Sequence, residues 1–163
     1  MLAYAPALKG PFVFDDRDLL YTRPGYPDTL GPWIGGLRPL LMFSYWLNFV
    51  ISRDPFGFHT VNLVLHILNG LLVFVIVRMI LERGGVTYGH SKSLAAFAAA
   101  VFLLHPVQTE SVAYVAGRSE CLSALLFFTA FAVFLMVRPS LRRRPADLTL
   151  VNRRPPLPAQ FPL

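Results

Sequence analysis

The chain has 163 residues, of which 55% are hydrophobic and 15% are charged, whereas soluble domains average roughly 25% charged residues. This apolar excess excludes an ordinary soluble domain and indicates a membrane protein. The net charge of +6 does not indicate nucleic-acid binding, because the basic residues flank apolar runs and do not line one face. A single cysteine, Cys121, excludes an internal disulfide.

The amino-terminal part of the sequence, residues 1–37, is rich in proline and glycine and shows no helical periodicity. Its prolines would break any long helix. The apolar start, residues 1–8, is far too short to cross a bilayer, and we interpret it as the end of a helix whose beginning is absent. Asp15 and Asp16 follow directly after an apolar triplet. Because adjacent residues cannot share one helix face, we expect these two carboxylates to diverge in a turn.

The next element is predicted over residues 38–52, where about a dozen apolar positions follow one another. This length is below the roughly 20 residues that a spanning helix needs. Tyr45 and Trp46 are residue types that favour the headgroup level of a membrane. We therefore expect a helix that lies at the interface or packs beside a bundle. Residues 1–58 are thus predicted to form one loop region that contains the acidic pair and this interfacial helix.

Residues 59–81 form the first predicted membrane span, with a length of roughly 35 Å as a helix. Four polar side chains, which we call the polar stripe, recur at spacings of three, four and three residues, and therefore share one helix face. They are His59, Asn62, His66 and Asn69. In lipid this stripe must turn toward other helices or a wet cavity, so it serves either interhelical hydrogen bonding or a polar substrate cavity. No metal site is expected, because the two histidines lie two turns apart without an acidic residue between them.

Two further spans are predicted over residues 94–107 and 121–137, so that residues 59–137 form a three-helix membrane region. The central loop, residues 105–120, is polar and ionisable although apolar runs flank it on both sides. Charges held at a membrane surface are costly and usually functional. We expect the polar stripe to face this loop or the second span. After the last span, residues 138–163 are rich in arginine and proline and are predicted to be a disordered tail.

The distribution of charge predicts the orientation of the chain in the membrane. Residues 1–58 and the central loop share one side, with six basic and seven acidic residues. The other side carries nine basic residues, most of them in the tail, and two acidic ones. The positive-inside rule therefore places the tail in the cytoplasm. The acidic loops are expected on the non-cytoplasmic side.

Ionisable residues of both signs therefore collect on the non-cytoplasmic side; they include Asp15, Asp16, Glu110, Arg118 and Glu120. A carboxylate there can act as general base toward an acceptor hydroxyl, and an arginine can hold a phosphate through a forked contact. Together these groups suit transfer from a lipid-phosphate donor to a hydroxyl, and we expect an aspartate of the pair to approach the central loop. The structural alternative is that the aspartates cap a turn and that Arg118 pairs with Glu110 or Glu120.

Five ordered motifs resemble a known family. They are Phe14-Asp15-Asp16, Arg38-Pro39-Leu40, Ser44-Tyr45-Trp46-Leu47-Asn48, residues 57–69 and the central loop. Together, over roughly residues 3–137, they resemble the amino-terminal membrane region of the transmembrane and tetratricopeptide-repeat proteins. That family belongs to the GT-C class of polytopic glycosyltransferases and is related to protein O-mannosyltransferases.

The resemblance implies an all-α membrane protein that forms part of a GT-C-type helical bundle, with three spanning helices and an interfacial helix. It implies that Asp15 and Asp16 are catalytic, and that a sugar, typically mannose, passes from a polyprenyl-phosphate donor to Ser or Thr of an exported protein. The candidate substrate-binding residues are His59, His105, Glu110 and Arg118. The expected partners are membrane lipid, the lipid-linked donor and the protein acceptor, with no cofactor, metal or nucleic acid. The expected location is a bacterial inner membrane or the endoplasmic reticulum membrane.

The sequence also departs from the family. Only residues 1–8 correspond to the helix that should precede the acidic pair, and the further spans and helical repeats expected after residue 137 are missing. We therefore interpret the chain as a fragment that is inactive on its own. Two other classes of function stay open. One is a non-catalytic membrane scaffold or assembly subunit, which the loss of the acceptor-binding repeats favours, and the other is a ligase or flippase for lipid-linked polymers.

Overall fold

The computed structural model is helical throughout its described part, which contains no strand. The structure describes residues 27–137 together with Tyr4, Leu8, Gly10, Pro11, Asp16 and Gly25. Its helices are α2 (Gly31–Ile34), α3 (Pro39–Ile51), α4 (Pro55–Arg83), α5 (Tyr88–Leu104), α6 (Gln108–Ala113) and α7 (Arg118–Val137). The all-α fold predicted from the sequence is therefore confirmed. The predicted disordered tail, residues 138–163, lies outside the described residues.

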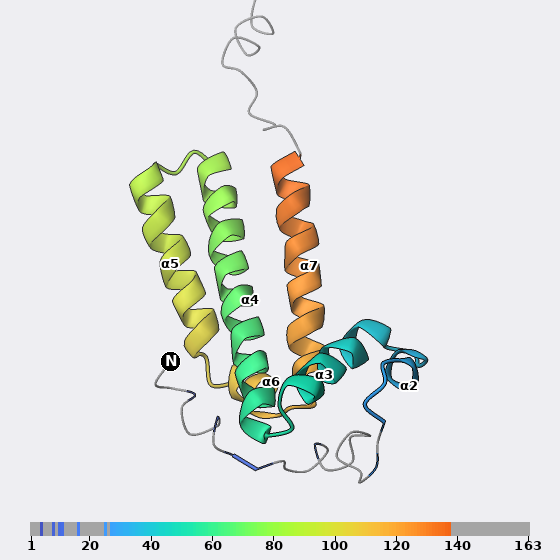
Figure 1. Ribbon diagram of the computed structural model, residues 1–163. Helices are drawn as coiled ribbons and strands as arrows, with labels where there is room; N and C mark the ends of the chain where they lie inside the picture. Colours follow the sequence, from blue (N-terminus) through green and yellow to red (C-terminus); the bar gives the residue numbers. More distant parts are fainter. Residues whose placement is uncertain are drawn as a thin grey trace, which may run out of the picture.

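Three long helices run side by side, with α4 between α5 and α7 (Figure 1). Two of them, α4 with 29 residues and α7 with 20 residues, are long and apolar enough to cross a membrane. The second expected span, residues 94–107, corresponds to α5, which has 17 residues and ends at Leu104. Because this helix falls short of the usual spanning length, the count of three spans stays a prediction.

The central helix α4 starts earlier than the sequence predicted because it has a strong amino-terminal cap. The side chain of Asp54 accepts a hydrogen bond from the backbone N–H of Phe56 at 3.0 Å, and Pro55 occupies the first helical position. Both features favour a helix start. The helix ends at Arg83, where Gly85 adopts the left-handed backbone with φ +89° and turns the chain toward α5.

Small residues bring α4 and α5 close together. A Cβ atom on Gly70 of α4 would lie 2.6 Å from the Leu103 side chain of α5. Ala95 and Ala99 of α5 are buried. Such close approach through small residues is typical of helices that pack in membranes.

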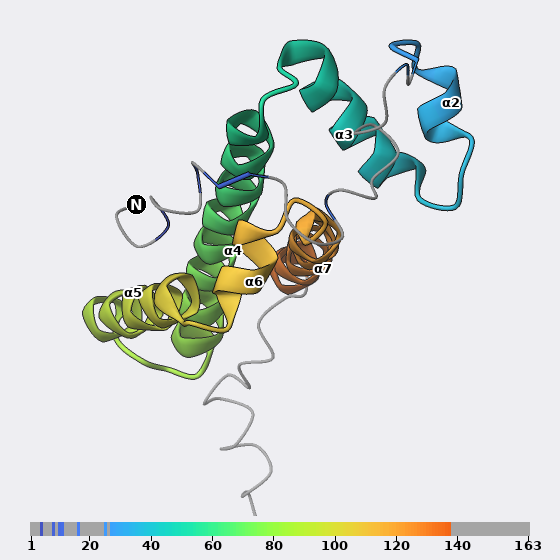
Figure 2. The same ribbon diagram turned by 90° about the horizontal axis from the view of Figure 1, so that it is seen from below.

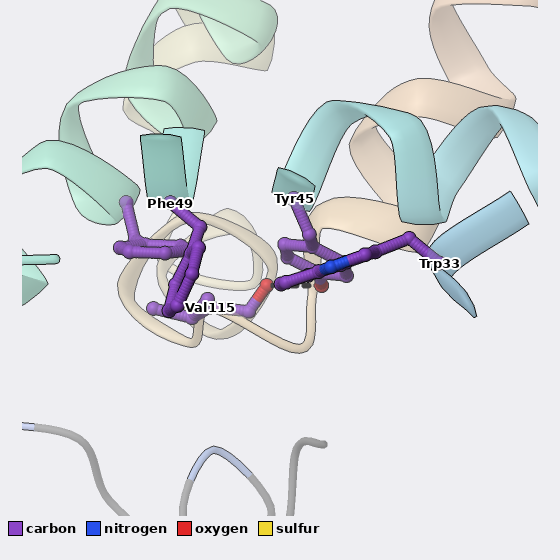
Figure 3. Close-up of a cluster of buried hydrophobic side chains, with 5 residues drawn as sticks. Trp33, Tyr45, Phe49 and Val115 are labelled. Carbon is purple, nitrogen blue, oxygen red and sulfur yellow. Dashed lines mark hydrogen bonds between the residues drawn. The ribbon is translucent and has the colours of Figure 1, made fainter. Parts of the chain in front are cut away.

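One end of the bundle is closed by the short helices. The amino-terminal ends of α4 and α7 and the carboxyl end of α5 meet there with α3 and α6 (Figures 1 and 2). A cluster of buried apolar side chains holds this end together; its members are Trp33, Tyr45, Phe49, Phe58 and Val115 (Figure 3). The α4–α5 connection and the carboxyl end of α7 lie at the opposite end.

The predicted interfacial helix 38–52 is present as α3, but one of its two aromatic anchors points inward. Tyr45 is buried in the cluster, although it was expected at the headgroup level. Trp46 is half-buried and donates a hydrogen bond through Nε1 to the carbonyl of Asp28 at 2.8 Å. The helix is therefore fastened to α7 and the central loop by its Tyr45 face, and its depth in a membrane stays a prediction.

Candidate functional site

A buried arginine lies at the centre of the closed end. Arg118 is the first residue of α7, and its side chain has 0% exposure. Its Nε donates to Oδ1 of Asn62 at 2.9 Å, and its Nη1 donates to the carbonyl of Ser44 at 3.1 Å. Its Nη2 donates to Oδ1 of Asn48 at 2.9 Å and to the carbonyl of Phe58 at 3.0 Å. One guanidinium group therefore joins α3, α4 and α7.

Aromatic rings complete the surroundings of this guanidinium. Its central carbon lies 4.5 Å from the centroid of the Tyr45 ring and 5.4 Å from that of the Phe58 ring. Stacking of a guanidinium on aromatic faces stabilises a cation that has left water. These hydrogen bonds and ring contacts explain how the protein can hold the Arg118 charge completely away from solvent, where an unpaired charge would be very costly.

The hydroxyl of Tyr45 ties α3 to the central loop. It donates a hydrogen bond to the carbonyl of Val115 at 2.8 Å. Burial raises the pKa of the Tyr45 phenol to about 12, although the nearby positive charge of Arg118 acts in the opposite direction. The phenol is therefore a hydrogen-bond donor throughout the physiological pH range.

Asp16 approaches the same loop from the amino-terminal segment. Its carboxylate has 0% exposure, and its Oδ1 accepts a hydrogen bond from the backbone N–H of Ala116 at 2.8 Å. Its Oδ2 accepts from the backbone N–H of Val115 at 3.2 Å. The prediction that an aspartate of the acidic pair approaches the central loop is thereby confirmed for Asp16. Asp15 lies outside the described residues, and the catalytic role of either aspartate stays a prediction.

His59 is buried close to Asp16. Its side chain is 2% exposed, and neither Nδ1 nor Nε2 has a partner with hydrogen-bond geometry among the residues that the structure describes. Within this part of the chain, the imidazole therefore has hydrogen-bonding capacity that is not used.

The remainder of the polar stripe forms hydrogen bonds with the central loop and the neighbouring helices. Asn62 donates through Nδ2 to the carbonyl of Tyr114 at 2.7 Å, and Asn69 donates to the carbonyl of Cys121 at 2.9 Å. The Nε2 atom of His66 lies 3.3 Å from the carbonyl oxygen of Leu103. The prediction that the stripe faces the central loop or the second span is confirmed for Asn62 and His66, whereas Asn69 bonds to α7 instead.

The other candidate binding residues are on the surface of this end. His105 is exposed, and its Nδ1 accepts a hydrogen bond from the backbone N–H of Val107 at 3.2 Å. Glu110 is exposed on α6. Glu120 is exposed and accepts a hydrogen bond from Oγ of Ser111 at 2.7 Å.

These positions also test the structural alternative for Arg118. The two ion pairs in the described part of the chain join Arg53 to Asp28 and Arg78 to Glu82. Among the described residues, the structure therefore does not contain the pairing of Arg118 with Glu110 or Glu120 that the sequence suggested as the alternative.

The described part of the chain contains no group of three or more metal-ligating side chains that could hold a metal ion.

Sequence reasoning missed the contribution of α3 to this site. Ser44 and Asn48 lie four residues apart and therefore share one helix face, and their carbonyl and amide oxygens both accept from Arg118. Tyr45 flanks them and also contacts the guanidinium. Asn48, a polar side chain in an apolar helix, was the usable signal, whereas the contact at Ser44 is made by its backbone carbonyl, which the residue type does not reveal.

Comparison with known proteins gives a consistent group of relatives. The mouse and human proteins named protein O-mannosyl-transferase TMTC1 are each 34% identical over 149 residues, and human protein O-mannosyl-transferase TMTC4 is 32% identical over 157 residues. Each alignment covers 80% of the chain. The chain itself spans 15% of mouse TMTC1, 16% of human TMTC1 and 21% of TMTC4. No family model and no solved structure matches the chain.

The similarity covers a share of the chain comparable to that of the ordered motifs. It agrees with the resemblance that these motifs carry, and with the apolar character of α4 and α7. Over the aligned 80% of its length, the chain therefore belongs to the family that contains the TMTC protein O-mannosyl-transferases.

Proposed function

We propose that this chain is the membrane part of a glycosyltransferase of the GT-C class, which transfers a sugar, typically mannose, from a polyprenyl-phosphate donor to Ser or Thr of an exported protein. The observation that carries the proposal is that relatives aligned over 80% of the chain are named protein O-mannosyl-transferases. These names also disfavour the scaffold, which was the alternative. The complete enzyme would contain three spans from this region, with α5 as the shortest.

The proposed reaction needs a base on the acceptor hydroxyl, and the acidic pair supplies two candidates. Asp16 is completely buried, and both of its oxygens already accept backbone N–H groups of the central loop. An acceptor hydroxyl cannot reach this carboxylate unless the loop moves away. We therefore assign the role of base to Asp15 and a positioning role to Asp16, which fixes the amino-terminal segment against the loop.

Arg118 fits a positioning role better than the phosphate-binding role expected from the sequence. It donates four hydrogen bonds to protein groups and has no exposed surface. A donor phosphate would have to displace Asn62 or Asn48 to reach it. Arg118 therefore supports the proposal by ordering the central loop, which carries the exposed candidates His105 and Glu110.

The orientation of this end is part of the proposal. The central loop, to which Asp16 is hydrogen-bonded, lies at one end of the bundle (Figure 1), and the excess of basic residues at the other end and in the tail favours a cytoplasmic tail. The acceptor would then be a protein that has entered the lumen or the periplasm. The donor would approach from the lipid, with its phosphate at the membrane surface.

Substitution of the acidic pair in an intact relative tests this function. Asp15→Asn removes the base and should lower the rate of sugar transfer about 10²- to 10⁴-fold, measured with a radiolabelled donor and a Ser- or Thr-containing acceptor. Asp28→Asn is the matched control, because Asp28 is exposed and pairs with Arg53 on the surface. Full transfer activity in Asp15→Asn would refute the assignment of the base, full activity in Asp16→Asn would refute the positioning role, and absence of transfer by the unmodified relative would refute the function.

A further inference from the structure

A groove of about 480 Å³ lies between the amino-terminal ends of α3 and α7. Polar side chains line one part of it, namely Arg38, Ser119, Glu120 and Ser123, and leucines line the rest. Leu126, the furthest lining residue along α7, lies eight residues after Arg118, which is about 12 Å along the helix axis. The groove therefore runs from the polar end of the bundle toward the apolar middle of a membrane-capable helix.

Arg38 is the positive group at the polar end of this groove. Its side chain is exposed, and no hydrogen bond or ion pair joins it to the part of the chain that the structure describes. It directly precedes Pro39, the first residue of α3, so its backbone is anchored while its guanidinium is free. An arginine in this state presents a planar fork of N–H donors that matches the oxygens of a phosphate.

Glu120 restricts the kind of anion that the groove can accept. It lines the groove as an exposed carboxylate, and it already accepts a hydrogen bond from Ser111. A carboxylate repels a small free anion but accepts hydrogen bonds from hydroxyl groups. Ser119 adds a hydroxyl beside it. The polar part of the groove therefore fits a phosphate together with a polyhydroxyl group.

The apolar part of the groove fits a lipid chain. Leu40 and Leu126 are each about half exposed, and Leu122 lies between Glu120 and Leu126 on α7. In a membrane these leucines face hydrocarbon, so a lipid chain can follow α7 without burying a polar group. The combination of an unpaired guanidinium, a carboxylate and a leucine surface matches a lipid-linked sugar phosphate by charge and polarity.

We propose, on the basis of the function proposed above, that this groove binds the lipid-linked sugar donor. Its phosphate binds Arg38, its sugar hydroxyls bind Glu120 and Ser119, and its prenyl chain follows Leu122 and Leu126 along α7. This places the donor phosphate at Arg38, on the surface of α3, and not at the buried Arg118.

The groove adjoins the Arg118 site, because its lining residue Ser119 directly follows Arg118 at the start of α7. The donor and the segment that carries the acidic pair would therefore meet at the same end of the bundle.

Binding of a probe to the full chain in lipid nanodiscs tests the site. The probe is a polyprenyl-phosphate mannose with a photoactivatable diazirine in its first prenyl units, and its affinity and its crosslinked peptides are measured. Arg38→Gln should weaken binding about tenfold or more, because one charge-assisted contact is lost. Arg53→Gln, which removes another exposed arginine at the same end, should change the affinity less than twofold. The crosslinks should fall within residues 119–126.

Three results would overturn the proposal: no binding by the unmodified chain, full affinity in Arg38→Gln, or crosslinks confined to α4 and α5. Phosphatidylglycerol, added at increasing mole fraction, should compete poorly with the probe; equal competition would identify a general anionic-lipid site instead. Donor binding is measured separately from sugar transfer. A relative that binds the probe through this arginine but transfers no sugar would contradict the proposed function alone.

Discussion

Replacement of Arg118 by methionine should strongly destabilise the closed end of the bundle. The change removes a fully buried guanidinium with four described hydrogen bonds, and it leaves the oxygens of Asn62 and Asn48 and two backbone carbonyls without this donor. Each buried acceptor left unsatisfied costs about 1–3 kcal/mol, so the loss of this donor from four acceptors should cost at least about 4 kcal/mol. For a chain of this size, such a loss corresponds to a fall in Tm of roughly 10 °C.

The assay is thermal unfolding of the detergent-solubilised chain, followed by the accessibility of the buried thiol of Cys121 to a maleimide. Arg118→Lys should recover only part of the stability, because one ammonium group cannot reach both asparagines at once. Arg53→Met is the matched control: its ion pair with Asp28 is 67% exposed on both sides, and it should shift Tm little. An Arg118→Met chain with unchanged Tm would refute the view that this arginine holds α3, α4 and α7 together.

Three further predictions follow from the structure. The pKa of Tyr45 is raised to about 12, so its protonated form contributes stability below pH 10 that is lost as the pH rises from about 10 to 12. Alkaline titration, followed by near-ultraviolet absorbance, should show a late tyrosine phase that the Tyr45→Phe substitution removes. An unchanged titration in this variant would contradict the prediction. Gly70→Ala should lower the stability by about 1–3 kcal/mol through its clash with Leu103, whereas Gly89→Ala, which meets no atom within 4 Å, should be neutral; equal melting temperatures would argue against close α4–α5 packing. In intact cells, an impermeant thiol reagent should label Thr109→Cys and not Thr87→Cys, and the reverse pattern would invert the proposed orientation.

Much of the helical arrangement could be predicted because membrane helices follow from length and apolar content. The sequence also predicted the inward face of the polar stripe, since four polar residues at helical spacing cannot all face lipid. Helix ends were less accurate: the first span was expected to begin at residue 59, although the cap at Asp54 and Pro55 starts α4 four residues earlier.

The candidate site was predicted in composition but not in its internal arrangement. The sequence placed Asp16 and Arg118 on one side of the membrane, but it treated Arg118 as a ligand for phosphate. Its burial depends on Ser44 and Asn48, which come from the helix that was expected to lie at the interface or to pack beside the bundle. A pairing between segments more than 50 residues apart leaves no local pattern in the sequence, so only the three-dimensional structure could reveal it.

The position of Arg118 in the chain constrains the order in which the protein can assemble. Ribosomes deliver α3 and α4 well before α7, so the oxygens of Asn48 and Asn62 must find water or temporary partners until residue 118 has left the ribosome. Only then can the guanidinium lock the first helices in place. A nascent chain halted before this residue should therefore retain a mobile α3, even with α4 already inserted. A helix that is synthesised later thus completes the packing of α3 and α4.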